Sequence, residues 1–225
     1  ERRVQPIGYG VLAADEILLH YRIRRGGANR ARVAAEQFFF QEGLAKEFDL
    51  ARYAAAVFDL DGTVWLSEQP VPGALAFVDR CRDLGLTITF ATNATAFSVA
   101  ALAELLIGCG LGREGDAVVT GGSVVARSLA SFGVHEVVAE VPPAMRAAIA
   151  DEGATVTVLA GVDIPDPWLT TSPDRAVVLG ASRAATFGSV ERIGHLASLG
   201  HPLYVTSLDA GYPALGRLEP GGGML

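Results

Sequence analysis

The chain has 225 residues, half of them hydrophobic, and a formal net charge of −7. This length has room for one large domain or for a core with a smaller inserted domain, and the acidic balance argues against general nucleic-acid binding. No apolar run reaches the roughly 18 residues that a membrane span requires, and no signal peptide is recognisable. We therefore expect a cytoplasmic protein with no membrane partner, whose two cysteines, Cys81 and Cys109, are reduced thiols rather than a disulfide.

The first 52 residues carry nine basic and seven acidic side chains, whereas the rest of the chain is strongly acidic. Five arginines lie in residues 21–32, ahead of a stretch of helical pattern that ends at Gly43. Such a basic stretch could contact an anionic substrate or a partner, but charge runs usually only solvate a surface. The three phenylalanines at residues 38–40 cannot all face one side of a helix. At least one of them is expected to pack on the main domain or on another chain. In the second case the protein could be a homo-oligomer.

Residues 54–65 contain an apolar run, then Asp59 and Asp61, then Gly62. Such a run predicts a strand buried on both faces, as central strands of parallel sheets are. In an extended chain residues i and i+2 project to the same side, so both carboxylates should face one space at the carboxyl end of the strand, where open α/β sheets bind ligands. They could act as a nucleophile, as a general acid and base, or as Mg²⁺ ligands. The alternative is a strand with an ordinary acidic turn, because Asp-Gly is a common turn dipeptide.

Helical and strand patterns alternate after the acids. A helix ended by Gly85 precedes a strand that starts at Leu86 and ends in Thr92 and Asn93; taken alone, Thr-Asn after a strand is usually a turn or a helix cap. A helix at 98–109, a strand at 117–120 and a helix at 123–132 would complete the first half of a doubly wound core. The Gly-Gly-Ser that opens the last helix lacks the spacing of a phosphate loop.

The alternation then restarts as a second α/β unit of about 75 residues. Strands are predicted at 134–141, 154–160, 175–182 and 201–207. One helix is predicted to begin at Pro142-Pro143, and a second to span 186–199. The last strand leads to residues 209–213, which taken alone read as a simple turn. The four histidines show no metal-ligand spacing.

The string Phe-Asp-Leu-Asp-Gly-Thr-Val at residues 58–64 resembles the first motif of the haloacid dehalogenase superfamily. In the phosphatases of that family the first Asp is the nucleophile and the second is the general acid and base. The resemblance implies these roles for Asp59 and Asp61, Mg²⁺ as a cofactor held by the same two residues, and hydrolysis of a small phosphorylated metabolite through an aspartyl-phosphate. The strand that ends at Thr92 resembles the second motif, whose hydroxyl donates to the phosphoryl group. Gly62 and Asn93 are implied to bind substrate.

The Thr-Asn pair and the order of elements in the second unit are similar to the subgroup of capped phosphatases that act on phosphoglycolate or p-nitrophenyl phosphate. The resemblance implies an α/β fold, with a doubly wound, Rossmann-like parallel-sheet core and an inserted α/β cap. We accordingly divide the chain into an N-terminal extension (1–52), the first half of the core (53–132), the cap (133–212) and the start of the return to the core (213–225).

In the family, segments after the cap supply a Lys that neutralises the nucleophile and the phosphate, and an acidic pair for Mg²⁺. No match to them occurs before Leu225, and Lys46, the single lysine, lies upstream of the first motif. We therefore expect an incomplete core and weak catalysis by this polypeptide alone, with an inactive fragment or a binding module that retains the fold as the alternative. The strands that would pair with the far side of the first strand are missing as well, so the edge at residues 57–60 is expected to be open.

Overall fold

The computed structural model describes residues 10–11, 16–19, 50–159, 164–214, 217–221 and 223. The chain forms two compact units. The first comprises Glu1–Thr92, Leu102–Val119 and Tyr212–Glu219, and the second comprises Asn93–Ala101, Thr120–Gly211 and Pro220–Leu225. The basic stretch at 21–32, the helical pattern that follows it and the three phenylalanines at 38–40 lie outside the described residues.

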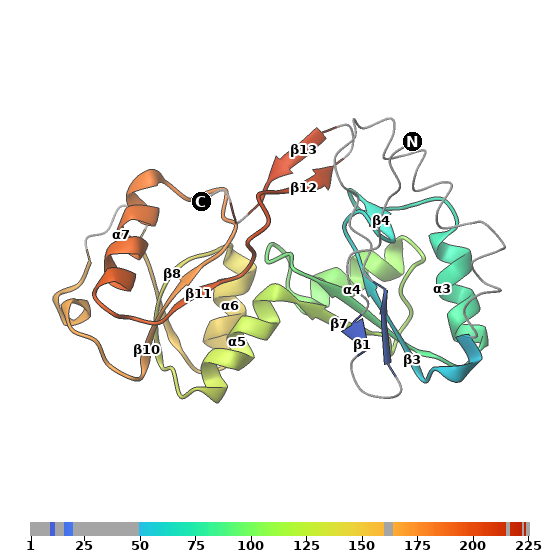
Figure 1. Ribbon diagram of the computed structural model, residues 1–225, viewed down its shortest axis with the longest axis horizontal. Helices are drawn as coiled ribbons and strands as arrows, with labels where there is room; N and C mark the ends of the chain where they lie inside the picture. Colours follow the sequence, from blue (N-terminus) through green and yellow to red (C-terminus); the bar gives the residue numbers. More distant parts are fainter. Residues whose placement is uncertain are drawn as a thin grey trace. The chain divides into compact units, whose positions relative to one another are not determined.

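A five-stranded sheet organises the first unit, in the order β1 (Gly10–Val11), β2 (Glu16–Leu19), β3 (Ala55–Asp59), β6 (Thr87–Thr92) and β7 (Ala117–Thr120) (Figure 1). The predicted acidic strand, β3, is the central strand. It runs parallel to β2 on one side and to β6 on the other. Because Asp59 is in register with Ala91, the carboxyl ends of β3 and β6 meet at one edge of the sheet.

The edge of β3 that we expected to be open is paired. Leu18 and Leu19 of β2 are in register with Val57 and Phe58, and β1 continues the sheet as an antiparallel partner of β2. The expectation was wrong because it assumed that only segments after the second unit could pair with this strand. Two short strands upstream of the first motif occupy the position instead, so part of the N-terminal extension belongs to the sheet.

Side chains that alternate along β3 and β6 build the core of the first unit. Phe58 and Phe90 are both buried, with ring centroids 5.9 Å apart, and Phe58 meets Phe77 edge to face at 6.1 Å. Phe77 belongs to α3 (Ala74–Asp83), which packs on β6 and also buries Val78 and Cys81. Edge-to-face ring pairs contribute about 0.5–1.5 kcal/mol beyond their buried area. Aromatic packing at Phe58 therefore anchors the strand that ends at Asp59.

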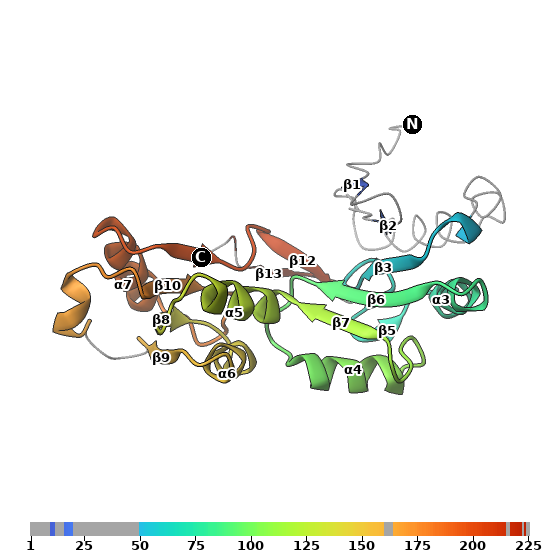
Figure 2. The same cartoon turned by 90° about the horizontal axis from the view of Figure 1, so that it is seen from below.

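The remaining elements of the first unit are short. The helix α4 (Val99–Gly108) precedes β7, and a 3-10 helix, η1 (Leu50–Arg52), precedes β3 (Figure 2). Two hairpins complete the list: β4 (Trp65–Leu66) with β5 (Gln69–Pro70), and β12 (Gly211–Ala214) with β13 (Arg217–Pro220). Cys81 is buried and Cys109 half-buried, and both are free thiols, as predicted.

The second unit is a four-stranded parallel sheet between two helical layers, in the order β11 (Leu203–Val205), β10 (Arg175–Leu179), β8 (Glu136–Glu140) and β9 (Thr155–Val158). The helices α5 (Gly121–Ser131) and α6 (Pro143–Asp151) pack on one another, and α7 (Phe187–Ser198) packs on β8 and β10 (Figure 1). A short 3-10 helix, η2 (Asp166–Leu169), precedes β10. The predicted second α/β unit is therefore present.

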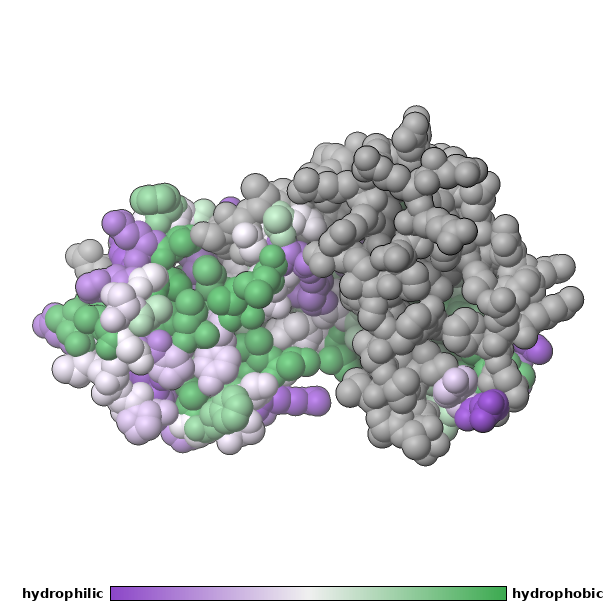
Figure 3. Space-filling model, in the orientation of Figure 1, coloured by the Kyte–Doolittle hydropathy of each residue, from purple (hydrophilic) through white to green (hydrophobic). Residues whose placement is uncertain are grey.

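Strand periodicity separates the two cores of this unit. Val137 and Ala139 of β8 pack with Leu129 of α5 and Met145 of α6, whereas Val138 packs on the other face with α7 and Trp168. Successive side chains of a strand point to opposite faces of the sheet. A strand whose residues are all apolar therefore contributes side chains to the hydrophobic cores on both faces. Figure 3 shows apolar residues, in green, among polar ones on the visible face of this unit.

Helix starts differ from the predicted ones where capping boxes fix them. We predicted a helix from residue 123, but α5 begins at Gly121, because Thr120 accepts from the Ser123 amide while Ser123 accepts from the Thr120 amide. The same type of capping box, formed by Thr186 and Ser189, starts α7.

Within the described residues, no helix is long and apolar enough to cross a membrane.

Candidate functional site

The strand β3 ends at Asp59, and the chain turns immediately after it. The Leu60 carbonyl accepts from the amides of Thr63, Val64 and Trp65, at 3.0, 3.1 and 3.2 Å. Gly62 adopts φ 81°, a left-handed conformation in which glycine carries no Cβ penalty. Asp61 thus lies in a turn rather than in an extended strand, and the geometric basis of our expectation for the two acids does not hold.

The turn nevertheless brings the acids close enough for their charges to interact. Asp61 also forms a side-chain hydrogen bond with Thr92, the buried last residue of β6. Because β3 and β6 are parallel neighbours, their last residues, Asp59 and Thr92, lie at the same edge of the sheet. Asp59, Asp61 and Thr92 therefore form one polar cluster in the first unit.

Two further residues of the turn hold the acids, and sequence reasoning did not assign them a role. The Thr63 hydroxyl donates to Oδ2 of Asp59 at 2.8 Å, and the Trp65 indole Nε1 donates to Oδ1 of Asp61 at 3.0 Å. Both donors are 2% exposed. Each lies four residues after its acid, a spacing visible in the sequence, but only the turn at Leu60 brings donor and acceptor together.

Burial raises the pKa of the Asp61 carboxyl above its ordinary value, and the negative charges of Asp59 and Glu68 raise it further. The hydrogen bonds from Trp65 and Thr92 oppose this shift because they favour the ionised form. The balance keeps the pKa raised. A carboxyl whose pKa is raised holds its proton to a higher pH than usual, which favours a role as a general acid.

The two residues that we expected to bind substrate have other partners. The Gly62 amide donates to the Trp65 carbonyl at 2.9 Å, which closes the turn. The Asn93 side-chain amide donates to Oδ2 of Asp209 at 2.8 Å, within the second unit. A Cβ at Gly121 would lie 2.7 Å from the Asn93 carbonyl, so glycine is required there by close backbone approach rather than by a phosphate.

Two carboxylates at one strand end are a donor set that suits Mg²⁺, which proteins commonly hold through one or two carboxylates together with waters and substrate oxygens. Asp59 and Asp61 bring such oxygen atoms to the end of β3. Across the described ranges, no group of three or more His, Cys, Asp or Glu is placed to hold a metal ion. Asp59 and Asp61 are thus the residues that would hold the ion.

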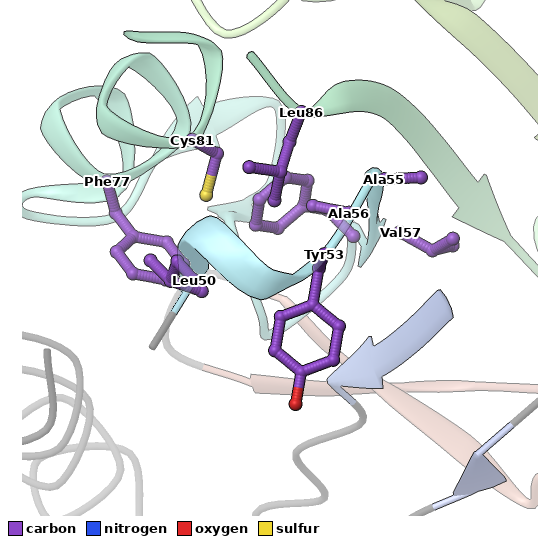
Figure 4. Close-up of a pocket in the computed structure, with 9 residues that line it drawn as sticks. Leu50, Tyr53, Ala55, Ala56, Val57, Phe77, Cys81 and Leu86 are labelled. Carbon is purple, nitrogen blue, oxygen red and sulfur yellow. The ribbon is translucent and has the colours of Figure 1, made fainter. Parts of the chain in front are cut away.

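The same unit contains an apolar cavity (Figure 4). It is lined by residues 55–58 of β3 and by Leu50, Tyr53, Phe77, Cys81 and Leu86. Its lining is almost wholly apolar and includes neither Asp59 nor Asp61. We therefore assign it to core packing.

Residues 56–155 match the family model described as haloacid dehalogenase-like hydrolase. Among solved structures, the chain is similar to a 4-nitrophenylphosphatase from Thermotoga maritima, with 23% identity and a TM-score of 0.64 over 78% of this chain and 62% of that one. It is also similar to a glycerol phosphate phosphatase from Mycobacterium tuberculosis in complex with magnesium, with 24% identity and a TM-score of 0.61 over 78% of this chain and 50% of that one.

A p-nitrophenyl phosphatase from Archaeoglobus fulgidus is similar at 20% identity, with a TM-score of 0.59 over 75% of this chain and 61% of that one. The chain thus spans between half and two thirds of the length of these three proteins. No curated protein sequence matches it. Residues 56–155 thus match the haloacid dehalogenase-like hydrolases, and the fold of the chain is similar to that of the solved structures named above.

Proposed function

We propose that the protein is a Mg²⁺-dependent phosphatase that hydrolyses a small phosphomonoester through an aspartyl-phosphate at Asp59. The observation that carries the proposal is the polar cluster at the end of β3, where Thr63 holds Asp59 and both Trp65 and Thr92 hold Asp61. The likeness to solved phosphatases supports catalysis over a non-catalytic binding module. The substrates for which these phosphatases are named suggest glycerol phosphate or an aryl phosphate as the substrate class.

In the first step a carboxylate oxygen of Asp59 attacks phosphorus, and the bond between phosphorus and the leaving oxygen breaks. Asp61 donates its proton to that oxygen, so the alcohol leaves neutral and Asp61 becomes a carboxylate. Thr63 orients the nucleophile through Oδ2. The Thr92 hydroxyl, at the same strand edge, donates to the phosphoryl oxygens.

In the second step Asp61 takes a proton from a water molecule, and the resulting hydroxide attacks the phosphorus of the aspartyl-phosphate. The bond from phosphorus to Asp59 breaks, which releases inorganic phosphate and restores both side chains. Mg²⁺, which Asp59 and the backbone carbonyl of Asp61 would hold, would supply positive charge that offsets the charge of the phosphoryl oxygens. In this proposal the residues at 133–212 act as the cap, Asn93 and Gly62 help to bind substrate, and the protein works in the cytoplasm.

The test is release of p-nitrophenol from p-nitrophenyl phosphate with Mg²⁺, with and without a chelator, for this chain and for the full-length gene product. We expect metal-dependent turnover that Asp59→Asn abolishes. Asp151→Asn, at the exposed end of α6, is the matched control and should behave as the parent. Turnover by Asp59→Asn at the parent rate, or no metal-dependent turnover by either parent protein, would refute the proposal.

A further inference from the structure

Asn93 directly follows Thr92, and its side chain is held in one orientation. The side-chain nitrogen Nδ2 donates to Oδ2 of Asp209 at 2.8 Å, and Oγ of Ser207 is a second acceptor 3.4 Å from the same nitrogen. Asn93, Ser207 and Asp209 all belong to the second unit. The reaction above gives the Asn93 side chain no defined contact, although its neighbour Thr92 belongs to the polar cluster. Because a peptide bond joins Asn93 to Thr92, the chain itself keeps the two residues together.

The acceptor, Asp209, is itself fixed by the loop in which it lies. Its amide donates to Oγ of Ser207 at 3.0 Å, the Ser207 hydroxyl donates to Oδ2 of Asp209 at 3.3 Å, and the Asp209 carbonyl accepts from the Gly223 amide at 2.9 Å. A Cβ at Gly121 would lie 2.7 Å from the Asn93 carbonyl, so the backbone of Asn93 packs closely on the first residue of α5. Both ends of the hydrogen bond between Asn93 and Asp209 are therefore held by further contacts within the second unit.

The chemistry of the two groups gives this bond a direction. A carboxylate only accepts hydrogen bonds, whereas an amide side chain donates from its nitrogen and accepts at its oxygen. The nitrogen of Asn93 must therefore face Asp209, and the oxygen Oδ1, which is attached to the same carbon atom, must face elsewhere. Among the residues that the structure describes, none donates a hydrogen bond to Oδ1 of Asn93, and the side chain is exposed. Asn93 thus presents a hydrogen-bond acceptor to a ligand.

An acceptor at this position distinguishes between the two parts of a phosphate ester. Phosphoryl oxygens are acceptors as well, so Oδ1 of Asn93 does not bind them, whereas the hydroxyl groups of a polyol are donors. We propose that Asp209 is a positioning residue that fixes Oδ1 of Asn93 as the acceptor for a hydroxyl group in the alcohol part of the substrate. The inference rests on the proposed phosphatase function. It narrows the substrate class to phosphate esters of polyols, ahead of alkyl or aryl esters that carry no such hydroxyl.

The test compares glycerol 3-phosphate with propyl phosphate, which share a propyl chain and an alkoxide leaving group, although only the former carries hydroxyl groups. Release of inorganic phosphate with Mg²⁺ gives kcat/KM for each ester, for this chain and for the full-length gene product. We expect the parent to prefer glycerol 3-phosphate by roughly threefold to tenfold, the range that one hydrogen bond contributes.

Two variants test the origin of this preference. Asn93→Leu keeps the shape of the side chain and removes the acceptor, so the preference should fall to about one. Asp209→Asn lets the Asn93 amide bind in either orientation, because the new side chain both donates and accepts, and the preference should fall by at least about twofold. In both variants the loss should come from kcat/KM for glycerol 3-phosphate, and the value for propyl phosphate should change little.

Asp151→Asn is the matched control, because it makes the same change at an exposed position of the same unit. It should leave the preference as it is in the parent. A parent without the preference, an unchanged preference in Asp209→Asn, or an equal loss on both esters would overturn the inference, since a purely structural role predicts an equal loss. If neither parent protein hydrolyses any of these esters or p-nitrophenyl phosphate, the proposed function is refuted and the inference with it.

A measurement that needs no turnover decides the contact itself. The chain has two asparagines, Asn29 and Asn93, so isotope labelling of asparagine alone should give two pairs of side-chain N–H signals in a nitrogen–proton correlation spectrum. Asn93→Leu identifies the pair that belongs to Asn93. In Asp209→Ala that pair should move while the Asn29 pair stays in place. If the Asn93 pair does not move, the hydrogen bond to Asp209 is absent and the inference fails.

Discussion

The hydrogen bond from Thr63 to Asp59 gives a quantitative test of the turn that builds the site. Thr63→Val removes the hydroxyl and keeps a branched side chain. The bond is 2.8 Å long, its donor is buried, and its acceptor is charged when Asp59 is ionised. Hydrogen bonds to charged groups contribute roughly 1.5–3 kcal/mol. Because Asp59 is only half-buried, water can replace part of the interaction, so we expect a loss near the lower end, about 1.5 kcal/mol.

The assay is urea unfolding in metal-free buffer at neutral pH, in a Trp168→Phe background. The remaining tryptophan, Trp65, then reports on the first unit alone, which avoids treating a two-unit chain as a single transition. In an Asp59→Ala protein the acceptor is gone, so Thr63→Val should lower the free energy of unfolding by less than it does when Asp59 is present. We expect the two losses to differ by at least about 1 kcal/mol. An equal cost in both backgrounds would show that the hydroxyl does not bind Asp59.

Three further predictions concern the same unit. Because folding raises the pKa of Asp61, its ionisation opposes folding above that pKa, and this effect vanishes at low pH where the folded and unfolded states are both protonated. Asp61→Asn should therefore stabilise the chain at pH 7 by roughly 0.5–2 kcal/mol and much less at pH 3 in thermal unfolding, and an equal gain at both would contradict the shift. Burial raises the pKa of the Cys81 thiol, so iodoacetamide at pH 8 should alkylate the half-buried Cys109 at least about tenfold faster, as followed by peptide mass spectrometry; equal rates would contradict the burial. Glu68 adopts φ 63° in the β4–β5 turn, so Glu68→Gly should raise the free energy of unfolding by about 1 kcal/mol in the urea assay, and a loss of stability would argue against this turn.

The sequence pattern predicted the elements whose signal is local. The apolar run before Asp59 is the central strand, the strand that ends in Thr92 lies beside it, and the second α/β unit has the expected order of strands and helices. In these segments apolar periodicity and capping residues both lie within a few positions of the element they define, so reading the chain in windows recovers them.

The features that the sequence did not predict depend on contacts between distant segments or on the path of a tight turn. The pairing of Leu18 with Val57 joins residues far apart in the chain. The local sequence of either strand does not indicate which strand it pairs with. The turn at Leu60 moved Asp61 out of the strand, and only with this turn in view do Thr63 and Trp65 become partners of the acids. Side-chain hydrogen bonds of this kind follow from the backbone path, which residue type and spacing do not fix.

The most direct test of the proposed reaction is to trap the covalent intermediate. The protein is mixed with Mg²⁺ and a substrate that carries radiolabelled phosphate, quenched in acid, digested, and the labelled peptide is sequenced. We predict one label on Asp59, released by hydroxylamine as an acyl phosphate is, and absent from Asp59→Asn. A label on another residue, or turnover by the parent protein with no labelled peptide, would contradict Asp59 as the nucleophile.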